Sequence, residues 1–280
     1  MRSLLFAPAN RPDLVAKTAR SGPDAVAIDL EDGVPTAEKA ATRALVPPAA
    51  AALRASCGEA SLITLRVNAP TTEWFETDVA EALCPEVDGV VVPKLESAEQ
   101  VQQVRRALAA AGREDASVIA GVETALGVHH VDEVVGAGVE AVYFGAEDYI
   151  ADMGGIRTAS SQEVLYARSR VALAARVAGV ASLDTVVVAF NDDAAFRADA
   201  EDGRAIGYRG KLCIHPSQVP LANEIFGHTQ AEVDRARRII NAFEESSSRG
   251  AGVTVVDGQM IDEPMVRLAR AVLADVAGRG

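Results

Sequence analysis

Short apolar runs alternate along the chain with longer segments in which apolar residues recur every three or four positions. The run Gly89–Pro93 has no polar residue between its valines, which is typical of a parallel strand covered on both faces. Helices must therefore pack against the predicted sheet. We predict eight strands, at Ser3–Ala7, Ala25–Leu30, Leu62–Asn68, Gly89–Pro93, Ser117–Val122, Ala141–Gly145, Thr185–Phe190 and Lys211–His215.

The segments between these strands have helical spacing, for example at Ser97–Ala111, Ser160–Ala178 and Ala194–Ile206. Eight alternating strand and helix units predict an α/β fold, a (β/α)8 TIM barrel. A doubly wound open sheet is the alternative, because it has the same alternation. No Gly-rich phosphate loop follows the first predicted strand, which weakens the nucleotide-binding form of that alternative.

The pattern changes after the eighth predicted strand. Helical stretches are predicted at Pro216–Ile225, Gln230–Glu245 and Pro264–Val276. The Ser- and Gly-rich break at Ser246–Gly252 is typical of a hinge, with a plain linker as the alternative. We therefore predict a barrel with its following helix over residues 1–245, and a C-terminal helical extension over residues 246–280 that acts as a lid.

Composition and charge narrow the class of protein. Of the 280 residues, 49% are hydrophobic and 24% are charged, so the chain can build a full core. The formal net charge of −13 argues against a general nucleic-acid binder, which needs clustered Lys and Arg. Cys57, Cys84 and Cys213 are scattered, and no apolar run is long enough to span a membrane. We therefore expect a cytoplasmic protein without disulfides or membrane contact.

Charged and polar side chains follow six of the predicted strands. They are Asp29-Leu30-Glu31-Asp32-Gly33, Arg66 with Asn68, Pro93-Lys94, Glu123-Thr124, Gly145-Ala146-Glu147-Asp148 and His215-Pro216-Ser217-Gln218. Taken singly, Asp32, Thr124 and Ser217 can equally be read as helix caps. Catalytic groups of a barrel lie at the carboxyl ends of its strands, where all of these residues would meet. Charges gathered there need to be paired or bound to a metal.

Glu123 and Asp148 are the residues that we expect to bind a metal ion. They follow neighbouring strands, so that both carboxylates can reach one ion, and two carboxylates with water and substrate oxygens suit Mg²⁺. No His/Cys cluster indicates zinc, and no GxSxG sequence indicates a serine hydrolase. Lys94 follows a strand, but nearby acids would keep it charged, which disfavours imine chemistry.

Eight short motifs follow one another over nearly the whole chain. They are Phe6-Ala7-Pro8-Ala9-Asn10-Arg11-Pro12, Asp29-Leu30-Glu31-Asp32-Gly33-Val34, Arg66-Val67-Asn68, Val92-Pro93-Lys94, Val122-Glu123-Thr124, Gly145-Ala146-Glu147-Asp148, Cys213-Ile214-His215-Pro216-Ser217-Gln218 and Gly258-Gln259-Met260-Ile261-Asp262. In this order the motifs resemble the citrate lyase beta-subunit-like family, within the HpcH/HpaI aldolase and citrate lyase superfamily.

The resemblance implies a Mg²⁺-dependent carbon–carbon lyase that forms a homotrimer or a dimer of trimers. Relatives cleave or form 3-hydroxyacyl thioesters such as malyl-CoA, β-methylmalyl-CoA, citramalyl-CoA or citryl thioesters. The small-molecule partners are then a CoA thioester and a 2-oxo acid. By the same resemblance, Glu123 and Asp148 hold Mg²⁺, and Arg66 contacts the reacting oxygens. Asp262 comes from the C-terminal segment, which in relatives closes over the site of a neighbouring subunit.

The resemblance and the expected chemistry together assign roles to the other polar residues. Arg66, Glu123 and Asp262 form the predicted catalytic set, in which Asp262 exchanges a proton with the acyl carbon. Backbone N–H groups around Ala146, Glu147 and Asp148 would bind the oxo-acid carboxylate. The expected CoA and thioester side consists of Asn10, Arg11, His215, Pro216 and Gln218. The residues expected to support the reacting groups are Asp29, Glu31, Asp32, Asn68 and Lys94.

Two other activities fit the same motifs. A citrate lyase beta subunit would act on a citryl thioester carried by an acyl-carrier protein and would need partner subunits. A class II pyruvate aldolase would need no CoA at all, although the segment around Asp262 argues against it. A lyase acting on a free CoA thioester remains the preferred prediction.

Overall fold

The computed structural model describes residues 1–278, which form two compact units. The first unit ends at Phe226 and the second begins at Gly227. This division differs from the boundary that we placed after residue 245. The reason is that helix α12, Gln230–Ser248, packs along helix α13, Glu263–Ala277, and so belongs with the C-terminal segment.

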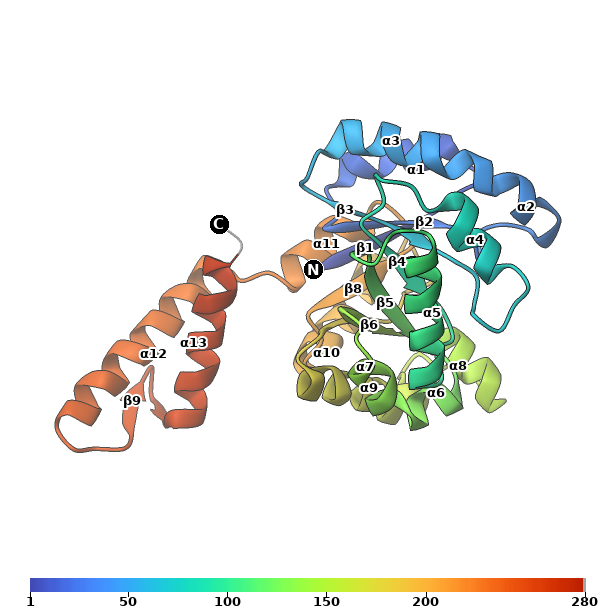
Figure 1. Cartoon of the computed structure of the whole chain (residues 1–280). Helices are drawn as coiled ribbons and strands as arrows, with labels where there is room; N and C mark the ends of the chain where they lie inside the picture. The colour runs from blue at the N-terminus through green and yellow to red at the C-terminus, as the bar shows by residue number, and fades with distance from the viewer. Residues whose placement is uncertain (279–280) are drawn as a thin grey trace. The chain divides into compact units, whose positions relative to one another are not determined.

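The first unit is a closed barrel of eight parallel strands (Figure 1). Strand β1 pairs with both β2 and β8, which closes the sheet and rules out the open-sheet alternative. The predicted TIM barrel is therefore confirmed. The strands are β1 Ser3–Pro8, β2 Ala25–Asp29, β3 Leu62–Arg66, β4 Gly89–Val92, β5 Ser117–Val122, β6 Ala141–Phe144, β7 Ala181–Asp184 and β8 Gly210–Cys213.

Helices cover the outside of the barrel between successive strands. They are α1 Pro12–Thr18, α2 Lys39–Thr42, α3 Val46–Cys57, α4 Phe75–Ala82, α5 Ala98–Ala110, α6 Ala125–His129, α7 Val131–Gly136, α8 Ala146–Met153, α9 Leu165–Ala178, α10 Asp193–Ile206 and α11 Gln218–Ile225. Four short 3₁₀ turns join them, at Ala19–Ser21, Thr36–Glu38, Arg43–Leu45 and Gln162–Val164. Within residues 1–278, no helix combines the length and the apolar character needed to cross a membrane.

The seventh strand was predicted in the wrong place. The apolar run Thr185–Phe190 lies in the loop after β7, where Val188 is 61% exposed and Phe190 is 45% exposed. The strand itself is the short segment Ala181–Asp184, which pairs with β6 and β8. The sequence pattern did not indicate this strand, because it contains the acidic residue Asp184. The structure can bury Asp184 because its carboxylate pairs with cations that come from elsewhere in the chain.

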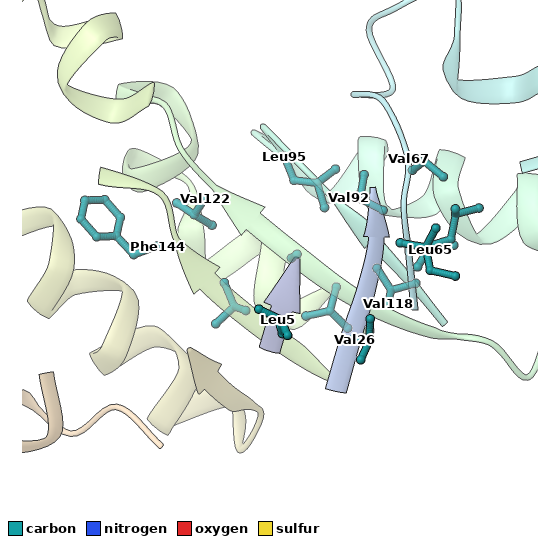
Figure 2. Close-up of a cluster of buried hydrophobic side chains, with 14 of the residues drawn as sticks. Leu5, Val26, Leu65, Val67, Val92, Leu95, Val118, Val122 and Phe144 are labelled. Carbon is teal, nitrogen blue, oxygen red and sulfur yellow. The ribbon is translucent and has the colours of Figure 1, made fainter. Parts of the chain in front are cut away.

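The strands divide their side chains between two apolar layers. Leu4, Val91, Ile119 and Leu212 point into the barrel, and a second layer packs between the strands and the helices. Figure 2 shows part of the second layer, which includes Leu5, Val26, Leu65, Val67, Val92, Leu95, Val118, Val122 and Phe144. Adjacent residues such as Leu4 and Leu5 belong to different layers, because successive side chains of a strand point to opposite faces.

A buried ion cluster ties β7 and β8 to the helices outside them. Arg168 of α9 donates from Nε and Nη2 to the two Asp184 oxygens, at 2.8 and 2.5 Å. Lys211 of β8 is fully buried, and its Nζ lies 2.8 Å from Asp184 and 2.5 Å from Asp199. Burial opposes the charge of Asp184, yet Lys211 and Arg168 hold its pKa below the ordinary value.

The second unit is a helical pair with a two-stranded hairpin between its helices. Strands β9, Thr254–Val256, and β10, Gln259–Ile261, are antiparallel. Val256 and Ile261 pack with Ile239 of α12 and Val266 of α13, so this unit has its own small core. Thr229 and Glu232 form a capping box at the start of α12, and Asp262 caps α13 by accepting from the Met265 N–H at 3.4 Å.

Removal of one cation from the buried cluster tests its contribution to stability. In Lys211→Met, Arg168 alone would face both carboxylates, and we expect a loss of about 3–5 kcal/mol in the free energy of unfolding. Urea denaturation followed by circular dichroism measures it. Lys17→Met removes an exposed partner of Asp13 and should cost less than about 1 kcal/mol. Equal losses in the two variants would contradict the structural role of the cluster.

Candidate functional site

A cavity of about 370 Å³ lies at the carboxyl ends of the barrel strands. Every strand except β4 contributes a residue of its own or of the loop after it. Seven of the predicted site residues line the cavity: Asp29, Asp32, Arg66, Glu123, Ala146, Glu147 and Asp148. The others in the lining are Phe6, Pro8, Gly33, Tyr143, Gly145, Thr185, Val186, Leu212 and Ile214. The closed sheet thus brings together residues that are far apart in the sequence.

Arg66 is held in a fixed orientation at one side of the cavity. Its Nε and Nη2 donate to the two oxygens of Asp29, both at 2.7 Å, and its Nη1 lies 2.9 Å from Glu31. The guanidinium also stacks on Phe6, 4.8 Å from the ring centre. Although burial opposes the charge, Asp29 and Glu31 raise the pKa of Arg66 well above its ordinary value. Arg66 is therefore a permanent positive charge aimed by two carboxylates.

Asp29 and Glu31 belong to a tight turn that follows β2. Asp29 accepts from the backbone N–H of Glu31 at 2.8 Å and of Gly33 at 2.9 Å. A Cβ on Gly33 would lie 2.5 Å from the Asp29 carboxylate, so any other residue there would displace that carboxylate. Burial, partly offset by Arg66, raises the pKa of Glu31 to about 7. Asp32 is 63% exposed and lies 3.8 Å from Arg66, at the edge of this group.

Glu123 follows β5 and is buried. Its Oε2 accepts from the backbone N–H of Lys94 at 3.2 Å, and its other side packs closely against Gly145. Burial, partly offset by Lys94, raises the pKa of Glu123. A cation beside this carboxylate would therefore stabilise its ionised form.

Lys94 lies among three carboxylates. Its Nζ is 2.7 Å from Glu31, 3.4 Å from Asp148 and 3.7 Å from Glu123. Burial opposes its charge, but Glu123 and Glu31 raise the pKa of Lys94 above the ordinary value. The ammonium therefore stays charged, as the sequence indicated, and imine chemistry at Lys94 is disfavoured.

The two predicted metal ligands lie close to each other. Lys94 Nζ contacts both Glu123 and Asp148, and both line the cavity. Two carboxylates without histidine or cysteine form a donor set that suits Mg²⁺. Within residues 1–278, no group of three His, Cys, Asp or Glu side chains has the arrangement of a complete metal site. Water and substrate oxygens would therefore complete the coordination of an ion held here.

The start of helix α8 forms another wall of the cavity. The backbone N–H of Ala146 donates to Thr185 Oγ1 at 3.2 Å, and Glu147 pairs with Arg157 at 2.9 Å. The amide of Ala146 and the carboxylate of Glu147 thus already have partners in the chain. The carboxylates of Glu147 and Asp148 are equally exposed, at 42%, but Glu147 is paired with Arg157 whereas Asp148 contacts Lys94 at 3.4 Å.

The predicted CoA side lies next to the cavity in sequence but does not line it. Asn10 and His215 are each within two residues of the lining residues Pro8 and Ile214. Asn10 donates to Glu38, and Arg11 pairs with Asp13. His215 stacks on Phe190, and Pro216 is exposed. Gln218 is buried, and its amide links Ile214 to Val187, so its polar atoms hold the loop.

Asn68, which the sequence analysis named as a supporting residue, belongs to a buried network whose other members, Lys39 and Asp78, were missed. Lys39 Nζ donates to the carbonyls of Leu30 and Glu31, at 2.8 and 2.6 Å, and to Asn68 Oδ1 at 2.7 Å. Asn68 donates to Asp78 at 2.6 Å. The network fixes the backbone of the turn that carries Glu31. Lys39 and Asp78 lie in ordinary helical segments, and no local pattern distinguishes them.

Tyr143 of β6 was also missed. It is 1% exposed, points into the barrel and lines the cavity. Burial and the neighbouring Glu123 raise the pKa of Tyr143 well above its ordinary value, so its hydroxyl stays protonated. The hydroxyl has no partner with ordinary hydrogen-bond geometry in the described part of the chain. In the sequence, Tyr143 is simply one more aromatic residue of an apolar strand.

Asp262 lies in the second unit, at the boundary between β10 and α13. Its carboxylate caps the helix, and its side chain is partly exposed. The predicted catalytic carboxylate therefore also has a structural function, which any substitution must take into account.

Comparison with known proteins assigns a family. The HpcH/HpaI aldolase/citrate lyase family matches residues 2–216. The chain is 52% identical to a citrate lyase subunit beta-like protein of Deinococcus radiodurans, over 99% of this chain and 98% of that protein. It is 32% identical to an L-malyl-CoA/beta-methylmalyl-CoA lyase of Rhodobacter capsulatus, over 97% of this chain and 93% of that protein.

A solved structure supports the same assignment. The fold matches protein CitE from Mycobacterium tuberculosis in complex with magnesium, acetoacetate and coenzyme A, with a TM-score of 0.78. The two sequences are 33% identical, and the match covers 98% of each chain. The predicted resemblance and the predicted carbon–carbon lyase class are confirmed at the level of the family.

The contact between Gly145 and Glu123 predicts the effect of adding one methyl group. A Cβ at position 145 would lie 2.6 Å from Glu123 Cγ and 2.9 Å from Oε1, so the carboxylate must move. In Gly145→Ala we expect Mg²⁺ affinity to fall at least about tenfold, since a ligand shifted by a fraction of an ångström loses coordination. Isothermal titration calorimetry measures it. In Gly136→Ala the methyl meets open space, and unchanged affinity is expected; matching affinities in both variants would argue against the assigned ligand.

Proposed function

Because the chain belongs to the HpcH/HpaI aldolase/citrate lyase family, we propose that it is a Mg²⁺-dependent lyase of 3-hydroxyacyl-CoA thioesters. The substrate would be a thioester such as malyl-CoA or citramalyl-CoA. The enzyme would cleave it to an acyl-CoA and a 2-oxo acid, or run the reaction in the direction of condensation. A cytoplasmic location and a homotrimer or dimer of trimers remain predictions from the sequence.

One observation carries this proposal. Arg66, Glu123 and Asp148 line one cavity, and the two carboxylates both contact Lys94 Nζ. Cleavage next to a hydroxyl requires a positive charge at the oxygen and a place for the oxo-acid product. Arg66 would supply the charge, and the two carboxylates, with a metal ion, would bind the product.

Arg66 would stabilise the oxygen whose charge changes during the reaction. Its hydrogen bonds to Asp29 use the N–H of Nε and one N–H of Nη2, while Nη1 forms an ion pair with Glu31 at 2.9 Å. Other N–H groups of Nη1 and Nη2 remain for an oxygen in the cavity, since a guanidinium has five N–H donors. A donor already held in position needs no reorganisation when the charge develops.

Glu123 and Asp148 would hold the metal ion. When bound there, Mg²⁺ supplies a Lewis acid that polarises the carbonyl of the 2-oxo acid. Glu123 is kept in place by the Lys94 N–H and by Gly145, whereas Asp148 lies in the first turn of helix α8 and is more exposed. Asp262 would exchange the proton with the acyl carbon, as a carboxylate shielded from water can.

A citrate lyase beta subunit is the second candidate. The citrate lyase subunit beta-like relative covers the whole chain at higher identity than the malyl-CoA lyase relative, and this favours the candidate. Such a subunit would act on a citryl thioester attached to a carrier protein. Its chemistry would use the same Arg66, Glu123 and Asp148, so the identity of the thioester carrier distinguishes the two.

A substrate panel tests the proposed function. Purified protein is mixed with malyl-CoA, β-methylmalyl-CoA or citramalyl-CoA, with Mg²⁺ or with EDTA, and released glyoxylate or pyruvate is trapped as a hydrazone. We expect release from at least one thioester in the presence of Mg²⁺ and none with EDTA. Release unaffected by EDTA would refute the metal dependence. If no product is released from any of the three thioesters but a carrier-bound citryl thioester is cleaved, the second candidate is the correct one.

The role of Asp262 is tested by a substitution that keeps the helix cap. Asparagine caps a helix about as well as aspartate, so Asp262→Asn removes the charge and preserves α13. We expect the rate of turnover to fall at least about 100-fold, as for loss of a general acid or base, with unchanged melting temperature. Asp192→Asn makes the same change at the cap of α10 and should leave turnover intact. Full turnover in Asp262→Asn would remove the residue from the mechanism.

A further inference from the structure

The contacts of Lys94 indicate a more specific role than support of the reacting groups. We propose that the Lys94 ammonium competes with the divalent cation for Glu123 and Asp148, and thereby sets the affinity of the site for Mg²⁺. This inference rests on the proposed function, because it takes those two carboxylates as the metal ligands. It makes Lys94 a positioning residue that acts through the carboxylates.

The distances place the ammonium on the same oxygens that an ion would need. Lys94 Nζ lies 3.4 Å from Asp148 Oδ1 and 3.7 Å from Glu123 Oε2. The same Nζ donates a hydrogen bond to Glu31 Oε1 at 2.7 Å. An ion held by Glu123 and Asp148 would therefore lie within a few ångströms of a unit positive charge. Repulsion over such a distance is strong in a partly buried site.

The backbone at Lys94 shows that this position serves the side chain. Lys94 has φ of 54°, a left-handed conformation that glycine adopts without strain and lysine does not. A glycine would satisfy the turn after β4 better. What lysine adds is the long side chain, which is 30% exposed and reaches three carboxylates.

Lys94 is also separate from the substrate cavity. It is not among the residues that line the cavity, although Glu123 and Asp148 are. A direct contact with substrate is therefore not its main function. Its charge instead acts through Glu123 and Asp148, whose oxygens lie 3.7 and 3.4 Å from its Nζ.

Loss of the ammonium should leave the ligands in place. Glu123 accepts its hydrogen bond from the backbone N–H of Lys94, at 3.2 Å, and this group survives every side-chain substitution. The close packing of Gly145 on Glu123 survives as well. The removal of a competing charge then outweighs any loss of preorganisation, and the site should bind Mg²⁺ more tightly.

The experiment measures Mg²⁺ binding to the full chain by isothermal titration calorimetry. We expect Lys94→Met to bind Mg²⁺ about tenfold more tightly than the wild type and to show a larger rise in melting temperature when Mg²⁺ is added. Lys94→Gly, which also relieves the left-handed backbone, should show the same gain. Lys94→Arg keeps the charge and should stay within about threefold of the wild type. Lys17→Met, the same charge change on the exposed face of α1, should have no effect.

The outcomes separate the inference from the proposed function. Equal or weaker binding by both Lys94→Met and Lys94→Gly, with normal binding by the wild type, would overturn competition by Lys94 and leave the metal site intact. Tighter binding by Lys94→Arg as well would show that charge is not the cause, and would also overturn it. No Mg²⁺ binding by the wild type would refute the proposed metal site itself.

Discussion

Charge compensation at the carboxyl end of the barrel is the constraint on which the site depends. The closed sheet gathers Asp29, Glu123 and Asp148 around one cavity, with Glu31 beside Arg66 and Lys94, and three of the four carboxylates are buried. Buried carboxylates that lie close together raise one another's pKa and lose their charge unless cations face them. Arg66 and the Lys94 ammonium supply that charge. The negative charge that they leave uncompensated is what would attract a divalent ion, so the same electrostatics explain both the internal ion pairs and the proposed metal site.

Close contacts with the main chain keep these charged side chains in place. Gly33 and Gly145 let the Asp29 and Glu123 side chains lie directly against the main chain, where any Cβ would collide with them. Behind them, Lys39 ties two carbonyls of the turn after β2 to Asn68. The proposed reacting groups are therefore held by short contacts, which is the preorganisation that electrostatic catalysis requires.

The barrel and the C-terminal unit are each stabilised by their own interior contacts. The barrel holds its own charged cavity, and a buried ion cluster around Asp184 fixes its seventh and eighth strands. The C-terminal unit has a separate core, formed by α12, α13 and the hairpin, so it can keep its structure as a body. Asp262 begins the last helix of that body. Its helix-capping contact fixes the carboxylate relative to its own unit, which favours its use as a reagent presented by a folded element.

The sequence by itself determined the alternation of strands and helices, seven of the eight strands and the charged residues that follow them, because these are local properties. Closure of the sheet into a barrel was decided by the pairing of β1 with β8. The position of β7 was decided only by tertiary structure, since Asp184 is compatible with a buried strand only when Arg168 and Lys211 reach it from other elements. The unit boundary was likewise decided by the packing of α12 on α13. Lys39 and Tyr143 had no recognisable pattern, because their importance comes from what surrounds them in space. The sequence specifies which side chains follow each strand. Only the closed sheet decides which of these side chains form ion pairs with one another.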